Sequence, residues 1–314
     1  IYSTLYSFPA IMKRNAMKGS VIPVYSGLPT VLQENGYCNL FFMTHESQYD
    51  NMNAFLRTNG FDEIYAQENY PSEKVVNSFG VQDDFMYQYA LPILNERAGT
   101  GNPFFSVLLS ISNHPPYVIP PYFHPHSDVL EEQIVEYADW SIRQFMQAAE
   151  KQPWFDNTIF VFLGDHGKMV GTPECEMPQS YNHIPLMIYG KDIKPGVYDG
   201  FGGQVDVSPT LLGLLNISYL QNNFGVNLLE EERPCMFFTA DNLIGARDSV
   251  NMFIYSPDSQ QEFKYKLEEG KLRAATGTDE EAFRNLKDYC FSMLQSTESL
   301  VKEHKTLDKV SVKK

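Results

Sequence analysis

The residues most able to do chemistry are the adjacent pair Asp165 and His166. They lie in a Gly-Asp-His-Gly sequence that directly follows the apolar run 159–163. A carboxylate beside an imidazole offers one hard and one intermediate ligand, a pair that suits Zn²⁺ or Mn²⁺. An Asp that caps a turn, next to an exposed His, would leave the same pattern. Asp165 and His166 are therefore candidate metal ligands that need support from the rest of the sequence.

Three further histidines also lie at the ends of apolar runs. His45 follows such a run, His114 follows another in the sequence Ser-Asn-His-Pro-Pro-Tyr, and His183 precedes a third. The two prolines after His114 restrict its loop, which favours a held imidazole. For His183, a purely structural role explains its position nearly as well as a role in a functional site does. Four of the seven histidines thus mark predicted strand boundaries, and this clustering indicates a site.

The apolar runs predict the strands that would carry these residues, because short continuous apolar runs suit strands buried on both faces. These runs are residues 38–43, 104–111, 159–163 and 184–189. Helical patterns lie between or beside them at residues 51–59, 83–97 and 130–151. Alternating strands and helices predict an α/β fold, a mostly parallel sheet sandwiched by helices. Such sheets bind ligands at the carboxyl ends of their strands.

The pattern changes after about residue 234. Residues 252–255 and 262–267 predict a hairpin or a meander, and residues 279–304 predict one amphipathic helix rich in charge. We therefore expect a main domain over residues 1–233 and a small C-terminal α+β subdomain over residues 234–314.

Composition excludes several classes of protein. With 24 basic and 39 acidic side chains the formal charge is -15, which disfavours binding to nucleic-acid phosphates. No apolar stretch approaches the ~20 residues that cross a bilayer, so the chain as given is expected to be soluble. Its four cysteines are far apart and form no CxxC pair, which excludes a cysteine zinc cluster.

The order of the motifs resembles the catalytic domain of the lipoteichoic acid synthase and phosphoglycerol transferase branch of the sulfatase superfamily. The motifs are NHPPY, FDNTIFVFLGDHG, NHIPLMIYG and GQVDVSPTLLGLL. The resemblance covers about residues 1–225, and the last three motifs together are far more specific than any one of them. It implies an alkaline-phosphatase-like fold with one divalent metal ion, Mn²⁺ or Zn²⁺, with Mg²⁺ as an alternative.

The resemblance also implies a role for each candidate residue. Asp165 and His166 match the Asp and His that bind the metal in this family. His114 matches a histidine that contacts the phosphate or its leaving group, and His45 matches one that binds substrate. His183 resembles a histidine of the same pocket in ethanolamine-phosphate transferases, which implies contact with substrate or with a second metal.

The segment after His45 departs from the synthase pattern. The synthases carry an Asp, a Trp and an Arg there, whereas this sequence reads Glu-Ser-Gln-Tyr-Asp-Asn-Met. Gln48, Asp50 and Asn51 are candidate replacements that would hydrogen-bond a different head group, of the phosphoglycerol or phosphoethanolamine type. Capping of a helix start is an equal interpretation of Asp50.

The nucleophile of the family is a Thr that precedes a helix resembling residues 1–9. We therefore expect the Thr, and a metal-binding Glu further upstream, to lie before Ile1, so that this piece alone is inactive. Thr4 is a weak alternative. Because the relatives have a membrane-embedded N-terminal part, the resemblance implies an extracytoplasmic domain, periplasmic or at the cell surface, of a bacterial membrane protein.

The implied activity is that of a metal-dependent phosphotransferase or phosphodiesterase acting on a phospholipid or glycan head group. A sulfuric ester hydrolase is one alternative, although no CxPSR-type sulfatase motif occurs. A binding domain that keeps the fold without the chemistry is another. Two aspartates are assigned structural roles: Asp206 as the cap of the following helix and Asp139 in a hydrogen bond.

Overall fold

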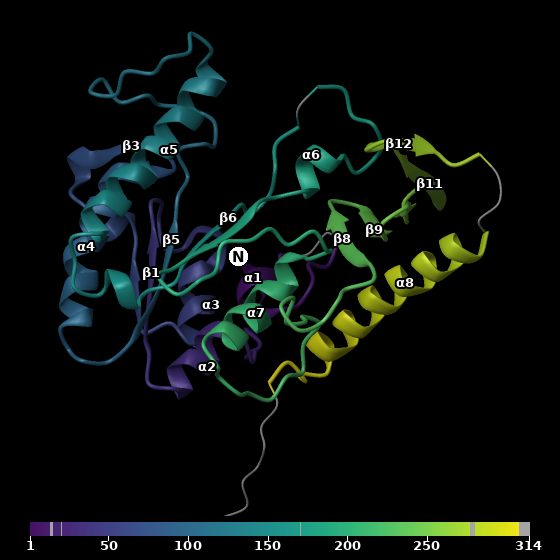
Figure 1. The fold of residues 1–314 in the computed structure, drawn as a ribbon, viewed down its shortest axis with the longest axis horizontal. Coiled ribbons are helices and arrows are strands. Elements are labelled where there is room, and N and C mark those ends of the chain that lie inside the picture. The colour runs from purple at the N-terminus through teal and green to yellow at the C-terminus, as the bar shows by residue number, and fades with distance from the viewer. Residues whose placement is uncertain (13–14, 20, 170, 277–279, 308–314) are drawn as a thin grey trace, which may run out of the picture. The chain divides into compact units, whose positions relative to one another are not determined.

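The computed structural model describes residues 1–12, 15–19, 21–169, 171–276 and 280–307 (Figure 1). The chain forms two compact units. We call Pro29–Ile159 the continuous unit. The split unit combines Ile1–Leu28 with Phe160–Lys314.

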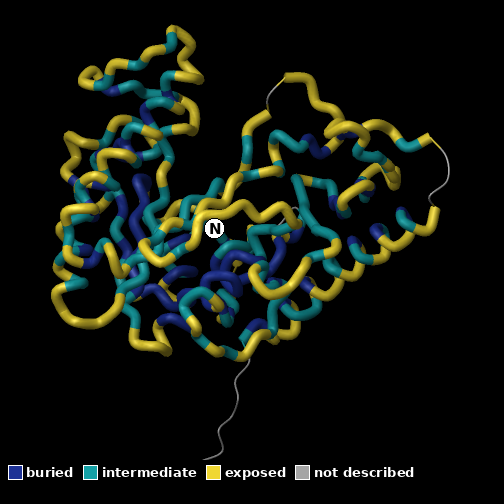
Figure 2. Tube along the Cα trace, viewed as in Figure 1, coloured by how far each residue is buried: buried dark blue, intermediate teal, exposed yellow. Residues whose placement is uncertain are grey.

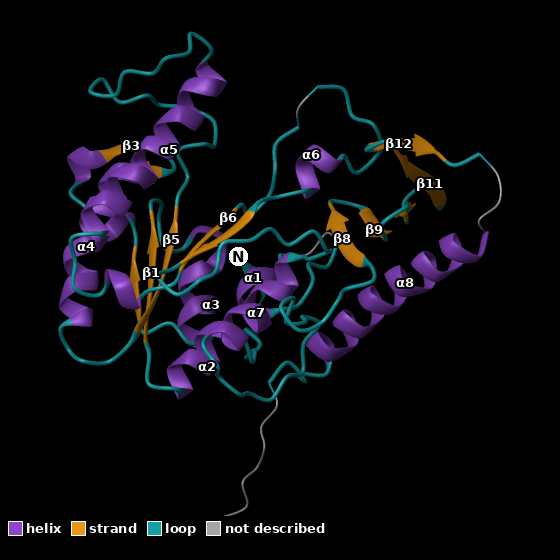
Figure 3. Cartoon of the chain, in the orientation of Figure 1, coloured by secondary structure: helices purple, strands orange, loops and turns teal. Residues whose placement is uncertain are grey.

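A parallel three-stranded sheet forms the centre of the continuous unit, with the strand order β2-β1-β5. Its strands are β1 (Cys38–Met43), β2 (Glu63–Tyr65) and β5 (Phe104–Leu109). Met43 of β1 pairs in register with Leu109 of β5, so the carboxyl ends of these strands lie side by side (Figure 3). The parallel pairing of residues 38–43 with 104–109 confirms the prediction for this part of the sheet.

Helices and one small hairpin complete the continuous unit. The helices are α2 (Leu28–Glu34), α3 (Met52–Thr58), α4 (Asp83–Ala98) and α5 (Leu130–Ala149). The hairpin consists of β3 (Val75–Asn77) and β4 (Gly80–Val81). Helix α4 packs on β1, β5 and α5. Strand β1 is almost completely buried, as expected for an apolar strand covered on both faces (Figure 2).

The apolar runs 159–163 and 184–189 form β6 (Phe160–Leu163) and β7 (Leu186–Tyr189) in the split unit. They pair antiparallel, and three of the four residues of β7 are exposed, so the prediction of doubly buried strands is wrong here. A parallel pair needs a crossover connection, usually a helix of some length. Among the described residues of the link between β6 and β7, the only helix is the four-residue α6 (Gln179–Asn182), and the chain returns as in a hairpin.

The C-terminal part of the split unit is a five-stranded antiparallel sheet of order β12-β11-β10-β9-β8. Its strands are β8 (Met236–Ala240), β9 (Leu243–Arg247), β10 (Asn251–Ser256), β11 (Gln261–Glu268) and β12 (Lys271–Ala274). Helix α8 (Glu280–Lys302) packs across β8, β9 and β10. The predicted hairpin and amphipathic helix are confirmed, whereas the domain boundary at residue 233 stays a prediction.

The N-terminal helix α1 (Tyr2–Tyr6) packs against α7 (Val207–Leu214). The Ser208 hydroxyl donates to the carbonyls of Thr4 (2.7 Å) and Leu5 (3.0 Å), which joins residues more than 200 positions apart. Within the described residues, no helix combines the length and the apolar composition needed to span a bilayer.

Candidate functional site

Asp165 and His166 lie directly after β6 and face outwards, with side chains 57% and 56% exposed. His166 Nδ1 is 2.7 Å from the Gly167 carbonyl, and an acceptor there keeps the proton on Nδ1. The lone pair is therefore on His166 Nε2, which lies 3.9 Å from Asp165 Oδ2. This tautomer and this spacing suit two ligands of one cation.

Helix α6 supports the loop of these two residues. The His166 ring stacks on the Tyr181 ring, with centroids 5.5 Å apart and planes at 13°. Gly167 N–H donates to the Tyr181 carbonyl (2.9 Å). A Cβ atom at Gly167 would collide with the Ser180 carbonyl, so only glycine permits this close approach.

Two further side chains fix the same region. Gln204 Nε2 donates to the carbonyl of Asp165 (2.7 Å) and, at 3.4 Å, to that of Gly164. Arg247 of β9 donates to Gln179 Oε1 (2.6 Å) and lies over the Phe201 ring, and burial lowers the pKa of its guanidinium. Gln204 and Arg247 were not identified from the sequence, because their partners are 39 and 68 residues away.

The donor set at this loop fits part of a divalent-metal site. It offers a carboxylate and an imidazole nitrogen with a free lone pair, as Mn²⁺ and Zn²⁺ accept. Among the described residues, no group of three or more His, Cys, Asp or Glu side chains is arranged to hold a metal ion. Asp165 and His166 therefore supply two ligands, and further ligands must come from elsewhere.

His45 lies two residues beyond β1 and is only 3% exposed. Its Nδ1 is 2.9 Å from the Glu46 carbonyl, and its ring lies 4.9 Å from that of Tyr49. A buried imidazole needs such a partner, because an unpaired polar group in the interior is costly. With a carbonyl facing Nδ1, the lone pair of the neutral ring lies on Nε2.

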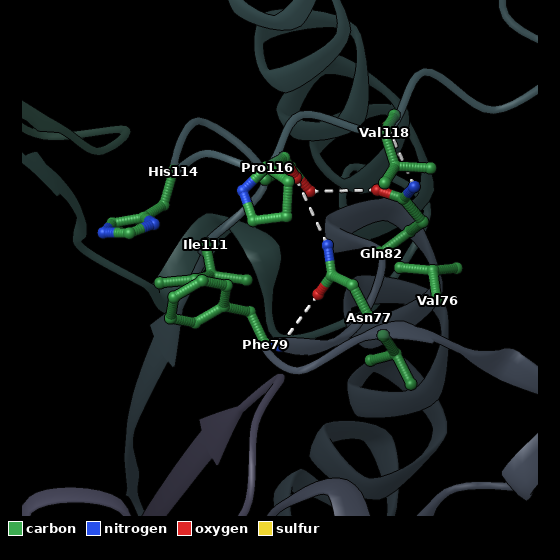
Figure 4. A pocket seen from close by; sticks show the side chains of 10 residues that line it. Val76, Asn77, Phe79, Gln82, Ile111, His114, Pro116 and Val118 are labelled. Carbon is green, nitrogen blue, oxygen red and sulfur yellow. Dashed lines mark hydrogen bonds between the residues drawn. The ribbon is translucent and has the colours of Figure 1, made fainter.

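His114 lies in the loop that follows β5 and is exposed. Its Nδ1 is 2.7 Å from the Pro115 carbonyl, and its main-chain N–H donates to the Ile111 carbonyl (2.8 Å). Its ring packs on the Phe79 ring at a centroid distance of 4.5 Å (Figure 4). The imidazole is thus held on one side and open on the other.

The turn between β3 and β4 connects the surroundings of these two histidines. Phe79 contacts the His114 ring, and the next residue, Gly80, packs on the main chain of Thr44 and His45. Gly80 has φ +90°, and a Cβ atom there would overlap the Thr44 carbonyl. The only sequence signal for this contact was the turn Asn-Ser-Phe-Gly, which does not reveal its partner.

The candidate head-group residues lie just beyond His45. Gln48 is exposed, and Asp50 and Asn51 are half-buried in consecutive left-handed conformations, with φ of 52° and 62°. Asp and Asn tolerate this region better than other side chains. The N-cap of α3 is Asn51, which makes no side-chain capping bond, and Asp50 lies one residue before it. Head-group binding and helix capping by Asp50 both stay predictions.

His183 and Thr4 are placed by helices of the split unit. His183 is exposed at the end of α6, where its N–H donates to the Gln179 carbonyl (2.7 Å). Thr4 is half-buried inside α1. Burial lowers the pKa of the Ile1 amino group, and the nearby Asp165 carboxylate opposes this shift. The start of α1 therefore lies within electrostatic reach of Asp165.

The candidates are divided between the units. Asp165, His166 and His183 belong to the split unit, whereas His45 and His114 belong to the continuous unit, as do the three head-group candidates. That the two groups form a single site stays a prediction.

Asp206 does not cap α7 with its side chain, so that prediction is wrong. Its buried carboxylate pairs with Arg233, with Oδ2 2.8 Å from Nε and Oδ1 2.5 Å from Nη2. It also accepts the N–H groups of Gly203 (2.8 Å) and Val226 (2.9 Å). The sequence did not predict Arg233 as the partner of Asp206, because it lies 27 residues further along the chain.

Asp139 keeps the structural role expected of it. Its carboxylate accepts from Arg143 one helical turn later at 3.2 Å, on the exposed surface of α5. Such i,i+4 pairs on a helix surface contribute little to stability.

Comparisons with known proteins agree with this architecture. Among solved structures, an alkaline phosphatase superfamily protein of Vibrio parahaemolyticus matches 95% of the chain and 74% of its own chain, with a TM-score of 0.84 and 26% identity. A lipoteichoic acid synthase of Listeria monocytogenes matches 96% of this chain and 79% of its own, with a TM-score of 0.79 and 24% identity. The fold is therefore of the alkaline phosphatase type, as the motifs implied.

Curated relatives point to the same branch. Lipoteichoic acid synthase 1 of Bacillus subtilis is 24% identical over 79% of this chain and 42% of its own length. Phosphoglycerol transferase I of Xanthomonas campestris is 25% identical over 76% and 36%. The chain thus spans about two fifths of the length of these relatives. The family model for sulfatases matches residues 2–217, more than half of the chain. This chain belongs to the sulfatase family, with relatives in its lipoteichoic acid synthase and phosphoglycerol transferase branch.

Proposed function

We propose that this chain is part of a metal-dependent phosphotransferase or phosphodiesterase acting on a phosphoglycerol-type or phosphoethanolamine-type head group. The observation that carries the proposal is the loop after β6, where Asp165 and the free Nε2 of His166 are presented together. The names of the curated relatives support transfer of a phosphoglycerol group.

Asp165 and His166 would hold one divalent ion, Mn²⁺ or Zn²⁺, with Mg²⁺ as an alternative. When bound, such an ion lowers the pKa of a hydroxyl nucleophile and neutralises phosphate charge. Tyr181 and Gln204 keep the two ligands in place, since they contact the His166 ring and the Asp165 carbonyl. These contacts reduce the reorganisation that ion binding would otherwise require.

The nucleophile in this proposal is a Thr that precedes Ile1 in a longer form of the protein. The start of α1 lies within electrostatic reach of Asp165, and this position supports the proposal because a residue preceding Ile1 would enter the surroundings of that carboxylate. Thr4 is the weaker candidate, since it lies inside α1 and its carbonyl accepts from Ser208.

His114 would steady or protonate the departing oxygen. Because its Nδ1 is engaged with the Pro115 carbonyl, the open Nε2 is the atom that would carry this proton. His45, Gln48, Asp50 and Asn51 would bind the head group, and His183 would line the same pocket. The acceptor would be a sugar or lipid hydroxyl, or water.

The proposal includes a setting for the protein. The substrate would be a phospholipid or glycan head group outside the cytoplasm, and a membrane domain of the same protein would hold the catalytic part at the cell surface or in the periplasm. A sulfuric ester hydrolase and a non-catalytic binding domain are the alternatives that the experiment must separate.

The test compares this chain with a longer form that includes the residues before Ile1. Each is assayed with Mn²⁺ or Zn²⁺ on chromogenic phosphodiester and sulfate ester substrates, and Asp165→Asn in the longer form is the control. We expect metal-dependent phosphodiester cleavage by the longer form alone. Sulfate ester cleavage would favour the hydrolase alternative, and inactivity on glycerol phosphate lipids as well would favour the binding domain.

A further inference from the structure

The loop that carries His114 is held by three consecutive polar residues at the start of α4. Gln82, Asp83 and Asp84 are 7%, 1% and 5% exposed, although two of them are carboxylates. Buried polar groups are tolerated only when they are hydrogen-bonded, because their loss of hydration must be offset. Within the segment 111–122, Asp83 bonds residues 111 and 112, Gln82 bonds residues 112 and 118, and Asp84 bonds Tyr122.

Asp83 binds the beginning of this segment. Its Oδ1 accepts the main-chain N–H groups of Ile111 (2.9 Å) and Ser112 (3.1 Å). In return its own N–H donates to the Ser112 hydroxyl (3.2 Å). These amides follow the end of β5 directly, and the Ile111 carbonyl accepts the N–H of His114. One carboxylate oxygen therefore sets the direction in which the chain leaves the sheet towards His114.

The neighbouring residues bind the rest of the segment. Gln82 accepts from the Ser112 hydroxyl (3.2 Å) and donates to the Val118 carbonyl (3.0 Å), on the far side of the prolines (Figure 4). Asp84 accepts from the Tyr122 hydroxyl at 2.9 Å and from the Tyr137 hydroxyl of α5 at 2.5 Å. The three side chains thus contact the segment at its start, middle and end.

We propose that Gln82 and Asp83 form a positioning clamp that sets the place of the His114 imidazole relative to the ends of β1 and β5, with Asp83 as its decisive member. Asp84 fixes the end of the segment at Tyr122 and is not part of this clamp. An apolar side chain at residue 83 would pack equally well but would leave the Ile111 and Ser112 amides without an acceptor. The functional meaning of the clamp rests on the proposed role of His114.

The cost of the arrangement supports this interpretation. Burial raises the pKa of Asp83, and its hydrogen bonds with Ile111 and Ser112 only partly oppose the shift. The position in the first turn of α4 favours a negative charge through the helix dipole. Burying this carboxyl group therefore costs free energy. Its hydrogen bonds to the Ile111 and Ser112 amides set the path of the loop.

The test measures the loop directly by NMR. In Asp83→Leu, which has no acceptor, we expect the Ile111 and Ser112 amides to exchange with solvent at least tenfold faster, and the His114 Cε1–H resonance to shift. Asp84→Leu is the matched control, since it alters an adjacent buried carboxylate that accepts from the Tyr122 and Tyr137 hydroxyls. It should leave these amides and His114 unchanged while moving the two tyrosine resonances. Unchanged exchange and an unmoved His114 resonance in Asp83→Leu would overturn the clamp.

A milder variant keeps the test decisive if Asp83→Leu does not fold. Ser112→Ala removes only the hydroxyl that joins Gln82 to the Asp83 N–H, so the Asp83 amide should exchange severalfold faster and His114 should again shift. No change in either signal contradicts the proposal. In the longer, active form, both variants should lower kcat at least tenfold with little change in KM. The NMR results do not require activity, so a failure of the clamp can be told apart from a failure of the proposed function.

Discussion

At the scale of single residues, the tautomer of His166 is the detail on which metal binding depends. The Gly167 carbonyl holds the Nδ1 proton and leaves Nε2 free beside Asp165. Metal binding therefore requires both the negative charge of Asp165 and the lone pair on His166 Nε2. Each can be tested separately by substitution.

Asp165→Asn should weaken binding of Mn²⁺ or Zn²⁺ at least tenfold, because it replaces an anionic ligand by a neutral amide of the same shape. Isothermal titration calorimetry on the longer form measures this directly. Asp139→Asn is the control, since that exposed carboxylate only pairs with Arg143. Equal affinities for Asp165→Asn and the unchanged protein would exclude Asp165 as a ligand.

The raised pKa of Asp83 predicts a pH dependence of stability. Between the unfolded pKa, about 3.9, and the higher folded pKa, the folded protein holds a proton that the unfolded chain has released. The contribution of Asp83 is therefore fully present at low pH and is lost as pH rises through this window, by up to about 1.4 kcal/mol per pH unit. Urea unfolding at several pH values, compared with Asp83→Asn, measures it; a stability difference that rises with pH would contradict the assignment.

At the scale of elements, two glycines with positive φ differ in how closely other parts of the chain pack against them. Gly36 and Gly80 have φ of +81° and +90°, but a Cβ atom meets nothing within 4 Å at Gly36 and meets the Thr44 carbonyl at Gly80. Gly80 thus brings the β3–β4 hairpin close to the main chain beside His45, where the Val81 N–H also donates to the Thr44 carbonyl (3.2 Å).

Gly36→Ala should cost about 1–2 kcal/mol from backbone strain alone. Gly80→Ala should cost that amount plus about 1–3 kcal/mol, because the Thr44 main chain must move. The free energies of unfolding in urea give both values, and the His45 and His114 resonances should shift only in Gly80→Ala. Equal costs for the two variants would mean that the close contact is unimportant.

At the scale of the whole molecule, the buried pair of Asp206 and Arg233 joins two separate segments of the split unit. Asp206 precedes α7, and Arg233 precedes β8 of the C-terminal sheet. Burial lowers the pKa of Arg233, but the hydrogen bond and the charge of Asp206 outweigh it and raise the pKa overall.

Arg233→Met should destabilise the protein by about 3–5 kcal/mol, because it leaves the Asp206 charge buried without its partner. The double variant with Asp206→Asn should recover part of this loss. Arg273→Met is the control, since its ion pair with Glu268 is exposed and worth about 1 kcal/mol or less. Denaturant unfolding of the four proteins gives their free energies of unfolding. If Arg233→Met loses no more stability than Arg273→Met, the buried pair does not stabilise the protein.

Local chemistry in the sequence was sufficient for several parts of the molecule. The apolar runs 38–43 and 104–109 identified the parallel strands β1 and β5, because continuous apolar runs are typical of strands inside a parallel sheet. The same reasoning placed His45 and His114 each beyond the end of a strand, and Asp165 with His166 just after β6; that the strands before the two histidines are neighbours came from the structure. The pattern of residues 252–255 and 262–267 identified the C-terminal hairpin. Apolar residues at helical spacing identified α8.

Only the tertiary structure decided the features that depend on a distant partner. The direction of β7 follows from the path of residues 164–185, which the apolar pattern of the strand does not contain. The roles of Asp83 and Asp206 depend on amides and a guanidinium that lie 27 to 29 residues away. A sequence records which side chains need burial or a hydrogen-bond partner, whereas the choice of partner is made when the chain folds and brings remote groups within 3 Å.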